Sequence, residues 1–237
     1  MFYRNLTFME HGIKPIWVFD GEPPKAKQEE LNNRSKIKEA AKEAKTRAEI
    51  EGDAEEEVKQ AKRSIKVTNE MVEQVKEMLN VLGVPFIQAK SEAEAQCALL
   101  NKKGLAFGVA SEDLDSLVYG ANVLLRHFKN DKKPVIQIEL QAILNELALT
   151  HEQFVSLCIL CGSDYTEPIK GIGPVRALGY VRQCKTLSET IEMLKTVTTK
   201  SKGTLKYKVP EGYSYDEALN TFNNPDVTDV NSLQVIL

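Results

Sequence analysis

The chain has 237 residues, of which 42% are hydrophobic and 27% are charged, and its formal net charge is −3 at pH 7. This length predicts one large domain, or one and a half, with enough apolar residues for a substantial core. No run of 18 apolar residues is present, which excludes a membrane-spanning helix and a membrane partner, and the first residues lack a signal-peptide pattern. Four cysteines without the spacing of a disulfide framework favour a reducing compartment.

The small net charge hides a segregation of charge along the chain. Residues 165–208 contain nine Lys and Arg and three acids. Residues 25–47 contain eight Lys and Arg and four acids. Residues 209–237 hold five acids and no Lys or Arg. Basic tracts beside acidic segments are typical of an enzyme that grips a polyanion and hydrolyses it with metal ions. Solvated helix faces are the alternative explanation of the same counts.

Apolar runs and helical patterns alternate along the chain. Between residues 25 and 82 the helical pattern has one interruption, at Gly52-Asp53, because Gly weakens a helix and Asp caps the next one. We therefore expect two long helices there. The runs with the composition of buried strands are residues 16–19, 84–87, 105–110, 122–128 and 134–139. Further helices are expected at residues 2–11, 140–148, 151–162, 174–184 and 187–196.

The order of these elements determines the predicted fold class. Long helical segments separate the first three strands, and such crossover connections are typical of parallel strands. The sequence therefore predicts an α/β fold with a mainly parallel sheet flanked by helices.

Carboxylates follow each of the first three predicted strands. Asp20 follows the first strand, Glu92 and Glu94 follow the second, and Asp113 and Asp115 follow the third. Ligands of open parallel sheets bind at the carboxyl ends of the strands. Acids gathered at one sheet edge repel each other unless a cation neutralises them, and an all-oxygen ligand set suits Mg²⁺ or Mn²⁺ better than zinc.

Local structure offers another explanation for some of these acids. An Asp before a glycine is a common turn former, and Ser91 with Glu94 has the pattern of a helix capping box. Neither explains Glu92, nor the repetition of an i, i+2 pair of acids after the third strand. We therefore predict a metal site, with Asp164 as a sixth candidate ligand. Since none of the three histidines lies in the acidic segments, a histidine-based nuclease mechanism is disfavoured.

Two basic features could hold phosphates. The segment Gly171-Ile172-Gly173-Pro174 predicts a tight turn into a helix with Pro at its first position, flanked by Lys170 and Arg176. Backbone N–H groups at such a turn bind phosphate without reading the base sequence. On the first long helix, Lys27 and Arg34 lie close to one line along the helix axis and could stand over a phosphate chain.

Four motifs, in order along nearly the whole chain, resemble the flap structure-specific endonucleases of the XPG/Rad-two nuclease family. The motifs are residues 18–24, 91–97, 111–115 and 162–174. The resemblance implies a helical arch and a C-terminal DNA-binding region of the helix-turn-helix type. It also implies a chain truncated at both ends, either a fragment or a shortened gene product. The implied regions are a remnant of the N-terminal nuclease region (1–24), the arch (25–82), the internal nuclease region with the metal carboxylates (83–150), the duplex-DNA-binding region (151–210) and an incomplete C-terminal extension (211–237).

By the same resemblance the acids and the basic residues acquire roles. Two Mg²⁺ ions are expected, for which Mn²⁺ can substitute, and K⁺ is expected at the 169–173 turn. Lys27 and Arg34 correspond to catalytic residues that contact the scissile phosphate. The implied metal ligands are Asp20, Glu92, Glu94, Asp113, Asp115 and Asp164. The implied DNA-binding residues are Lys27, Arg34, Glu92, Asp164, Lys170, Gly171, Gly173 and Arg176.

The implied activity is that of a Mg²⁺-dependent 5′ flap endonuclease and 5′–3′ exonuclease that hydrolyses DNA phosphodiesters by two-metal catalysis in replication and repair. The expected partner is DNA with a 5′ flap or a nicked junction. The expected location is nuclear, with the nucleolus or mitochondrion as variants, and the expected state is a monomer. The family's sliding-clamp motif is not found after residue 209. The alternatives are a non-catalytic junction-binding relic and a junction-resolving nuclease.

Overall fold

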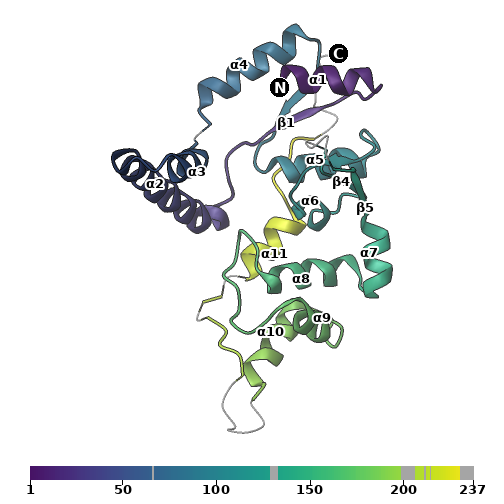
Figure 1. Cartoon of the computed structure of the whole chain (residues 1–237). Helices are drawn as coiled ribbons and strands as arrows, with labels where there is room; N and C mark the ends of the chain where they lie inside the picture. Colours follow the sequence, from purple (N-terminus) through teal and green to yellow (C-terminus); the bar gives the residue numbers. More distant parts are fainter. Residues whose placement is uncertain (66, 129–132, 199–205, 211, 214, 230–237) are drawn as a thin grey trace. The chain divides into compact units, whose positions relative to one another are not determined.

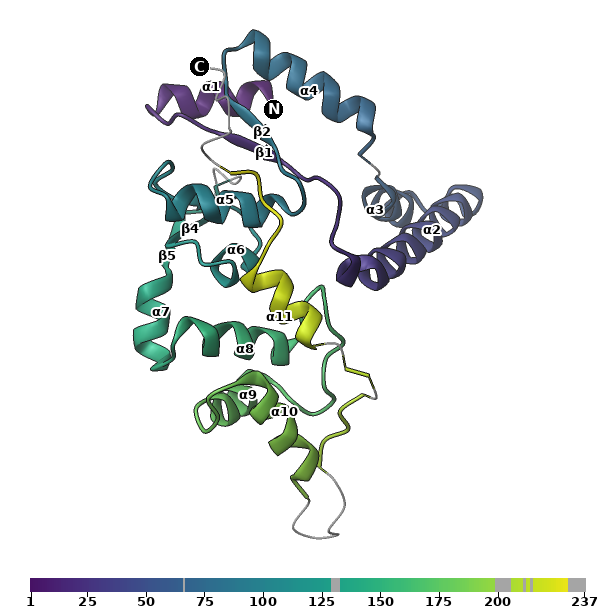
Figure 2. The same cartoon turned by 180° about the vertical axis from the view of Figure 1, so that it is seen from behind.

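The computed structural model describes residues 1–65, 67–128, 133–198, 206–210, 212–213 and 215–229. These residues form two compact units, the first made of residues 1–19 and 27–87, the second of residues 20–26 and the described residues from 88 onward. Figures 1 and 2 show the elements from opposite sides. Among the described residues, no helix combines the length and the apolarity that crossing a membrane requires.

The first unit pairs a small sheet with helices. The indole Nε1 of Trp17 donates to Oδ1 of the buried Asn5 at 2.9 Å, and Phe8 stacks on the same indole, so that the first helix is fixed against the first strand. The first two strands are hydrogen-bonded neighbours. The elements are α1 (Phe2–Glu10), β1 (Trp17–Phe19), α2 (Gln28–Glu51), α3 (Ala54–Ser64), α4 (Asn69–Val81) and, at the boundary of the unit, β2 (Phe86–Gln88).

The segment 25–82 holds three helices after a short 3₁₀ turn, so the prediction of two long helices was wrong. The predicted break at Gly52-Asp53 is confirmed: Gly52 is left-handed (φ +74°), and the Asp53 side chain accepts from the backbone N–H of Glu56. A second break follows α3, because Ile65 is extended and Thr68 caps α4 with its hydroxyl. Figure 1 shows α2 and α3 side by side as a helical hairpin.

The second unit carries the remaining strands and helices. Its sheet has the order β3-β4-β5, with β3 parallel to β4 and β4 antiparallel to β5. The connection of residues 127–135 is shorter than the dozen or so residues that a parallel crossover needs, which explains the antiparallel pair. The elements are α5 (Ala93–Lys102), β3 (Val109–Ala110), α6 (Asp115–Val118), β4 (Val123–Arg126), β5 (Ile136–Glu139), α7 (Leu140–Leu147), α8 (His151–Cys161), α9 (Pro174–Val181), α10 (Leu187–Thr196) and α11 (Tyr215–Asn223).

The predicted α/β class is confirmed, and strands occur within or overlapping all five predicted runs. They are shorter than predicted, and among the described residues they lie in two small sheets. Helix α8 is the centre of the second unit: its side chains Val155, Ile159 and Leu160 have no exposed surface. Both views show α8 between α9 and α11.

One buried amide aligns the strands that lead to the acids. The side chain of Asn101, at the end of α5, donates to the carbonyls of Ala106 and Phe107. Its Oδ1 accepts from the backbone N–H of Asn122 at 2.6 Å and of Val123 at 3.2 Å. Asn101 therefore joins the approach to β3 to the start of β4, and it satisfies backbone groups that burial would otherwise leave unpaired.

The C-terminal part is tied back to the acid-bearing helix. The side chain of Gln96 on α5 has no exposed surface; its Nε2 donates to the Thr228 carbonyl at 3.1 Å, and its Oε1 accepts from the Thr228 N–H at 2.8 Å. Helix α11 was not predicted within the extension 211–237, because its apolar residues are few and only Ala218 and Phe222 are buried. Residues 211, 214 and 230–237 of that extension lie outside the described residues.

Candidate metal centre

A glycine brings the end of β1 against the start of α5. The N–H of Gly21 donates to the Ser91 carbonyl at 2.7 Å, and a Cβ on Gly21 would overlap the backbone of residues 89–90. This close approach places Asp20 at the N-terminus of α5, where its Oδ1 accepts from the N–H of Ala93 at 2.9 Å. The turn-forming sequence after Asp20 is therefore what positions its carboxylate.

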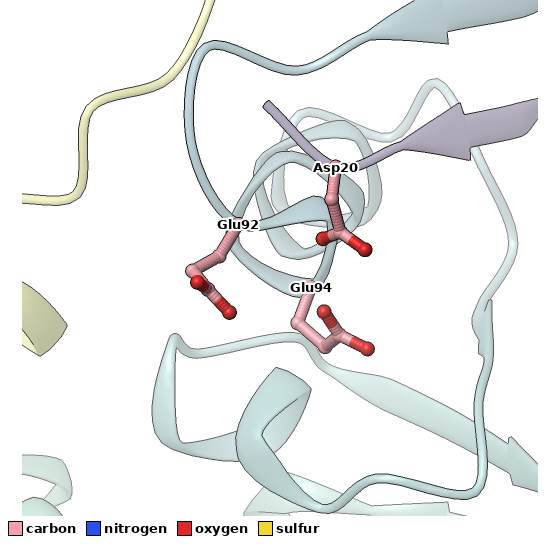
Figure 3. A group of neighbouring side chains, drawn as sticks. All are labelled: Asp20, Glu92 and Glu94. Carbon is pink, nitrogen blue, oxygen red and sulfur yellow. The ribbon is translucent and has the colours of Figure 1, made fainter. Parts of the chain in front are cut away.

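Three of the six predicted metal ligands form one group. Asp20, Glu92 and Glu94 each offer a carboxylate oxygen, and these atoms all lie within 4.8 Å of one another. Figure 3 shows the three side chains at the end of β1 and the first turn of α5. Glu92 is buried and Glu94 half-buried. The positive end of the α5 dipole favours acids here, but its partial charge is too small to neutralise three carboxylates.

The electrostatics of this acid group favour a bound cation. Burial raises the pKa of Glu94, and the neighbouring carboxylates of Asp20, Asp113 and Glu92 raise it further, against a backbone hydrogen bond that lowers it. A cation among these oxygens would reverse the sign of the charge effects. Hard oxygen ligands at this density fit Mg²⁺ or Mn²⁺.

The other three predicted ligands lie outside this group of three. Asp113 is exposed just after β3, and its Oδ1 accepts from the Asp115 N–H at 3.0 Å, a turn that starts α6. Burial and the charge of Asp20 raise the pKa of Glu94, and the Asp113 carboxylate adds to this rise. Asp164 is half-buried between α8 and α9. The metal roles of Asp113, Asp115 and Asp164 stay predictions.

A neighbouring acid is engaged in a different way. Glu112 lines an open cleft of about 570 Å³ with Asp113, and it pairs with Arg126 at 3.8 Å. The same carboxylate accepts from the N–H of His127 at 2.9 Å. Glu112 therefore anchors the end of β4 beside the cleft that Asp113 also lines.

Sequence reasoning missed a pair of tyrosines next to the acids. The hydroxyls of Tyr119 and Tyr165 lie 2.6 Å apart in the protein interior. Burial raises the pKa of Tyr119; the bond to Tyr165 lowers it, and the carboxylates of Glu92 and Asp115 raise it further. The sequence feature that could have indicated this pair is the position of each tyrosine near an acid: Tyr165 follows Asp164 directly, and Tyr119 lies four residues after Asp115.

The predicted phosphate-binding turn has the expected form. Gly171 is left-handed (φ +87°), Gly173 precedes α9, and Pro174 is the first residue of that helix. Lys170 is exposed, and the guanidinium of Arg176 donates to the Gly171 carbonyl at 2.7 Å. A carbonyl oxygen has two lone pairs, and the K⁺ expected at this turn stays a prediction.

The predicted catalytic cations lie in the first unit. Lys27 is half-buried and directly precedes α2. Arg34 lies within α2, where it is exposed and paired with Glu30. The acids belong to the second unit. The roles of Lys27 and Arg34 therefore stay predictions.

Without metal ions, the stability of the chain should fall as the pH rises above about 4.5, the ordinary pKa of Glu94. Because the folded state raises this pKa, it binds the proton more tightly than the unfolded state does; that stabilisation is complete at low pH and is lost as the pH rises through the raised pKa. Urea unfolding in EDTA from pH 4 to 8 measures the effect, and Glu94→Gln should reduce the slope. Equal slopes for both chains would contradict the assignment.

Comparisons with known proteins agree with this geometry. The family model of the XPG N-terminal domain matches residues 1–41, and that of the XPG I-region matches residues 83–164. Flap endonuclease 1-A of Xenopus laevis is 43% identical over 232 residues, which cover 97% of this chain and 59% of that protein. The chain thus spans about three fifths of the length of the curated relatives it matches.

Solved structures give the same result. Flap endonuclease-1 from Methanococcus jannaschii is 34% identical with a TM-score of 0.67, and the match covers 97% of this chain and 67% of that one. The catalytic core of Rad2, solved in complex with a DNA substrate, is 25% identical with a TM-score of 0.70, over 96% of this chain and 70% of that one. The chain therefore belongs to the XPG family, which includes the flap endonucleases.

Proposed function

We propose that the chain is a structure-specific DNA nuclease that hydrolyses phosphodiesters at 5′ flaps and nicked junctions, with Mg²⁺ as its cofactor. The observation that carries the proposal is the group formed by Asp20, Glu92 and Glu94. Three oxygen ligands within 4.8 Å of one another, with a carboxyl pKa raised by burial and by like charge, form a site whose charges call for a divalent cation.

The six acids would form two metal positions. Asp20, Glu92 and Glu94 would hold one Mg²⁺, and the three acids that lie outside their group would complete a second position. Two such ions, when bound, supply an activated water and stabilise the leaving oxygen of the phosphodiester. The protein's own part is orientation: the Ala93 N–H fixes the Asp20 carboxylate, and the start of α5 fixes the other two.

The proposed DNA partner is supported by the basic turn. The exposed Lys170 and the glycine turn that leads into α9 belong to the second unit, and a lysine beside such a turn can hold a phosphate chain independently of base sequence. The catalytic roles of Lys27 and Arg34, the monomeric state and a nuclear location are part of the same proposal.

Cleavage of labelled DNA by the purified chain tests the proposal. We expect a 5′ flap substrate to be cut in Mg²⁺ or Mn²⁺ and left intact in EDTA, and blunt duplex to be cut far more slowly. Tight flap binding without cleavage would favour the non-catalytic relic instead. Faster turnover of a four-way junction than of a flap would favour the junction-resolving alternative.

Removal of the two groups of cations should have separable effects. Lys27→Ala is expected to slow single-turnover cleavage roughly tenfold or more while affinity changes little, because its charge acts on the developing charge of the phosphate. Lys170→Ala is expected to weaken binding and to lower the slope of log affinity against log salt by about 0.9 for the lost phosphate contact.

The two measurements check each other. Salt titrations of flap binding and single-turnover rates at saturating enzyme are recorded for both variants, with Lys103→Ala, an exposed lysine after α5, as the matched surface control. Loss of affinity with an unchanged rate for Lys27→Ala would refute its catalytic role.

A further inference from the structure

We propose that Tyr119 and Tyr165 are positioning residues that set the spacing of Asp115 and Asp164 through the hydrogen bond between their hydroxyls. The inference rests on the proposed function, because it concerns the acids assigned to the second metal position. The two phenol oxygens are 2.6 Å apart and join the α6 region to the 163–166 loop.

The first step is the link from each tyrosine to its acid. The backbone N–H of Tyr119 donates to the Asp115 carbonyl at 2.9 Å, so Tyr119 closes the short helix that Asp115 opens. Tyr165 follows Asp164 directly in the chain. A shift of the backbone that carries either acid therefore also moves the neighbouring tyrosine, and the hydrogen bond between the two hydroxyls opposes that shift.

The second step is the stiffness of the loop around Asp164. The N–H of Tyr165 donates to the Ser163 hydroxyl at 3.3 Å, and the hydroxyls of Ser163 and Thr166 are 3.1 Å apart. These bonds hold the loop internally, but they do not place it relative to α6. Among the hydrogen bonds of this loop described above, the one from Tyr165 to Tyr119 reaches across to α6.

The third step is the packing that holds the two rings. Phe222 of α11 contacts both, with ring centroids 5.1 Å from Tyr119 and 5.0 Å from Tyr165, and the three side chains are 4 to 5% exposed. The rings cannot swing apart without opening this cluster. We call Tyr119, Tyr165 and Phe222 the aromatic cluster.

Packing alone does not require hydroxyls at this place. Two phenylalanines would fill nearly the same space, whereas two buried hydroxyls are tolerated only when they are paired. The pair adds direction and distance to a contact that would otherwise be non-directional.

The test is Mn²⁺ binding by the whole chain, measured from the electron paramagnetic resonance signal of the free ion. The double variant Tyr119→Phe/Tyr165→Phe removes both hydroxyls, leaves no orphan polar group and keeps both rings. We expect the weaker Mn²⁺ site to lose about 10- to 100-fold in affinity, the effect typical of lost partners behind metal ligands. The melting temperature in EDTA should change little.

A second tyrosine pair supplies the matched control. The Tyr180 hydroxyl donates to Tyr207 at 3.3 Å, and the nearby charge that acts on Tyr180 is the cation Arg176. Tyr180→Phe removes a longer hydrogen bond of the same kind, and it should leave Mn²⁺ affinity unchanged.

Wild-type Mn²⁺ affinity in the double variant would overturn the inference, as would an equal loss in Tyr180→Phe. Should the double variant unfold in EDTA, the same titration on Tyr119→Phe decides between the outcomes. A wild-type chain that binds two Mn²⁺ ions but leaves flap DNA uncut would contradict the proposed function. It would leave the positioning role of the tyrosines standing.

Discussion

Glu94→Gln is expected to slow metal-dependent cleavage of a 5′ flap by at least about 100-fold, because it removes a ligand from the centre of the acid group. Affinity for the flap in EDTA should persist or increase, since one negative charge near the phosphates is gone. Single-turnover cleavage and binding titrations on the same substrate measure the two effects. Glutamine keeps the size of the side chain, so the loss would report on charge and ligation.

The same variant has a thermal signature that needs no DNA. A ligand that binds only the folded state raises its melting temperature, so Mg²⁺ should stabilise the wild-type chain more than Glu94→Gln. Glu146→Gln, an exposed acid on α7, is the matched control and should behave as wild type in both assays. Cleavage by Glu94→Gln at the wild-type rate would remove Glu94 from the metal site.

Leu160→Ala is expected to lower the free energy of unfolding by about 2–5 kcal/mol, which is a large part of the stability of a single domain. Leu160 has no exposed surface and lies in α8, the helix between α9 and α11. The substitution leaves a cavity where the second unit has its centre. Urea unfolding followed by circular dichroism measures the loss.

The neighbouring residue provides the comparison for that experiment. Cys161 is exposed on the last turn of the same helix, and Cys161→Ala should change the free energy of unfolding by less than about 0.5 kcal/mol. Similar midpoints for the two variants would mean that α8 is not the core helix of the second unit.

Local patterns in the sequence predicted the elements that carry the acids. Asp20 follows an apolar run and precedes a glycine, and both features depend on a few neighbouring residues; the strand end and the tight turn are where they were expected. The break at Gly52-Asp53 was equally predictable, since a left-handed glycine and a capping aspartate act within one turn. The α/β class followed from the same local signals.

Features that depend on residues far apart in the chain were not predictable in the same way. The sequence offered six candidate acids, but which of them converge depends on side-chain directions at the start of α5, and three of them form the group. The hydrogen bond between Tyr119 and Tyr165 joins residues 46 positions apart, and no local sequence pattern predicts which side chain a tyrosine hydroxyl will bind. The antiparallel direction of β5 follows from the short connection between β4 and β5, which the hydrophobic periodicity of the sequence does not reveal.

The buried amide of Gln96 sets an order of events during synthesis. Its partner, Thr228, comes 132 residues later in the chain, a distance that takes on the order of ten seconds to translate. Until then the amide stays hydrated or unpaired, and α5, which carries Glu94, lacks the segment that covers it. The acid-bearing helix therefore reaches its final packing late, after α8 and α9 have left the ribosome. An unfinished chain would present the basic turn at residues 169–173 before it could present the fully packed acid group.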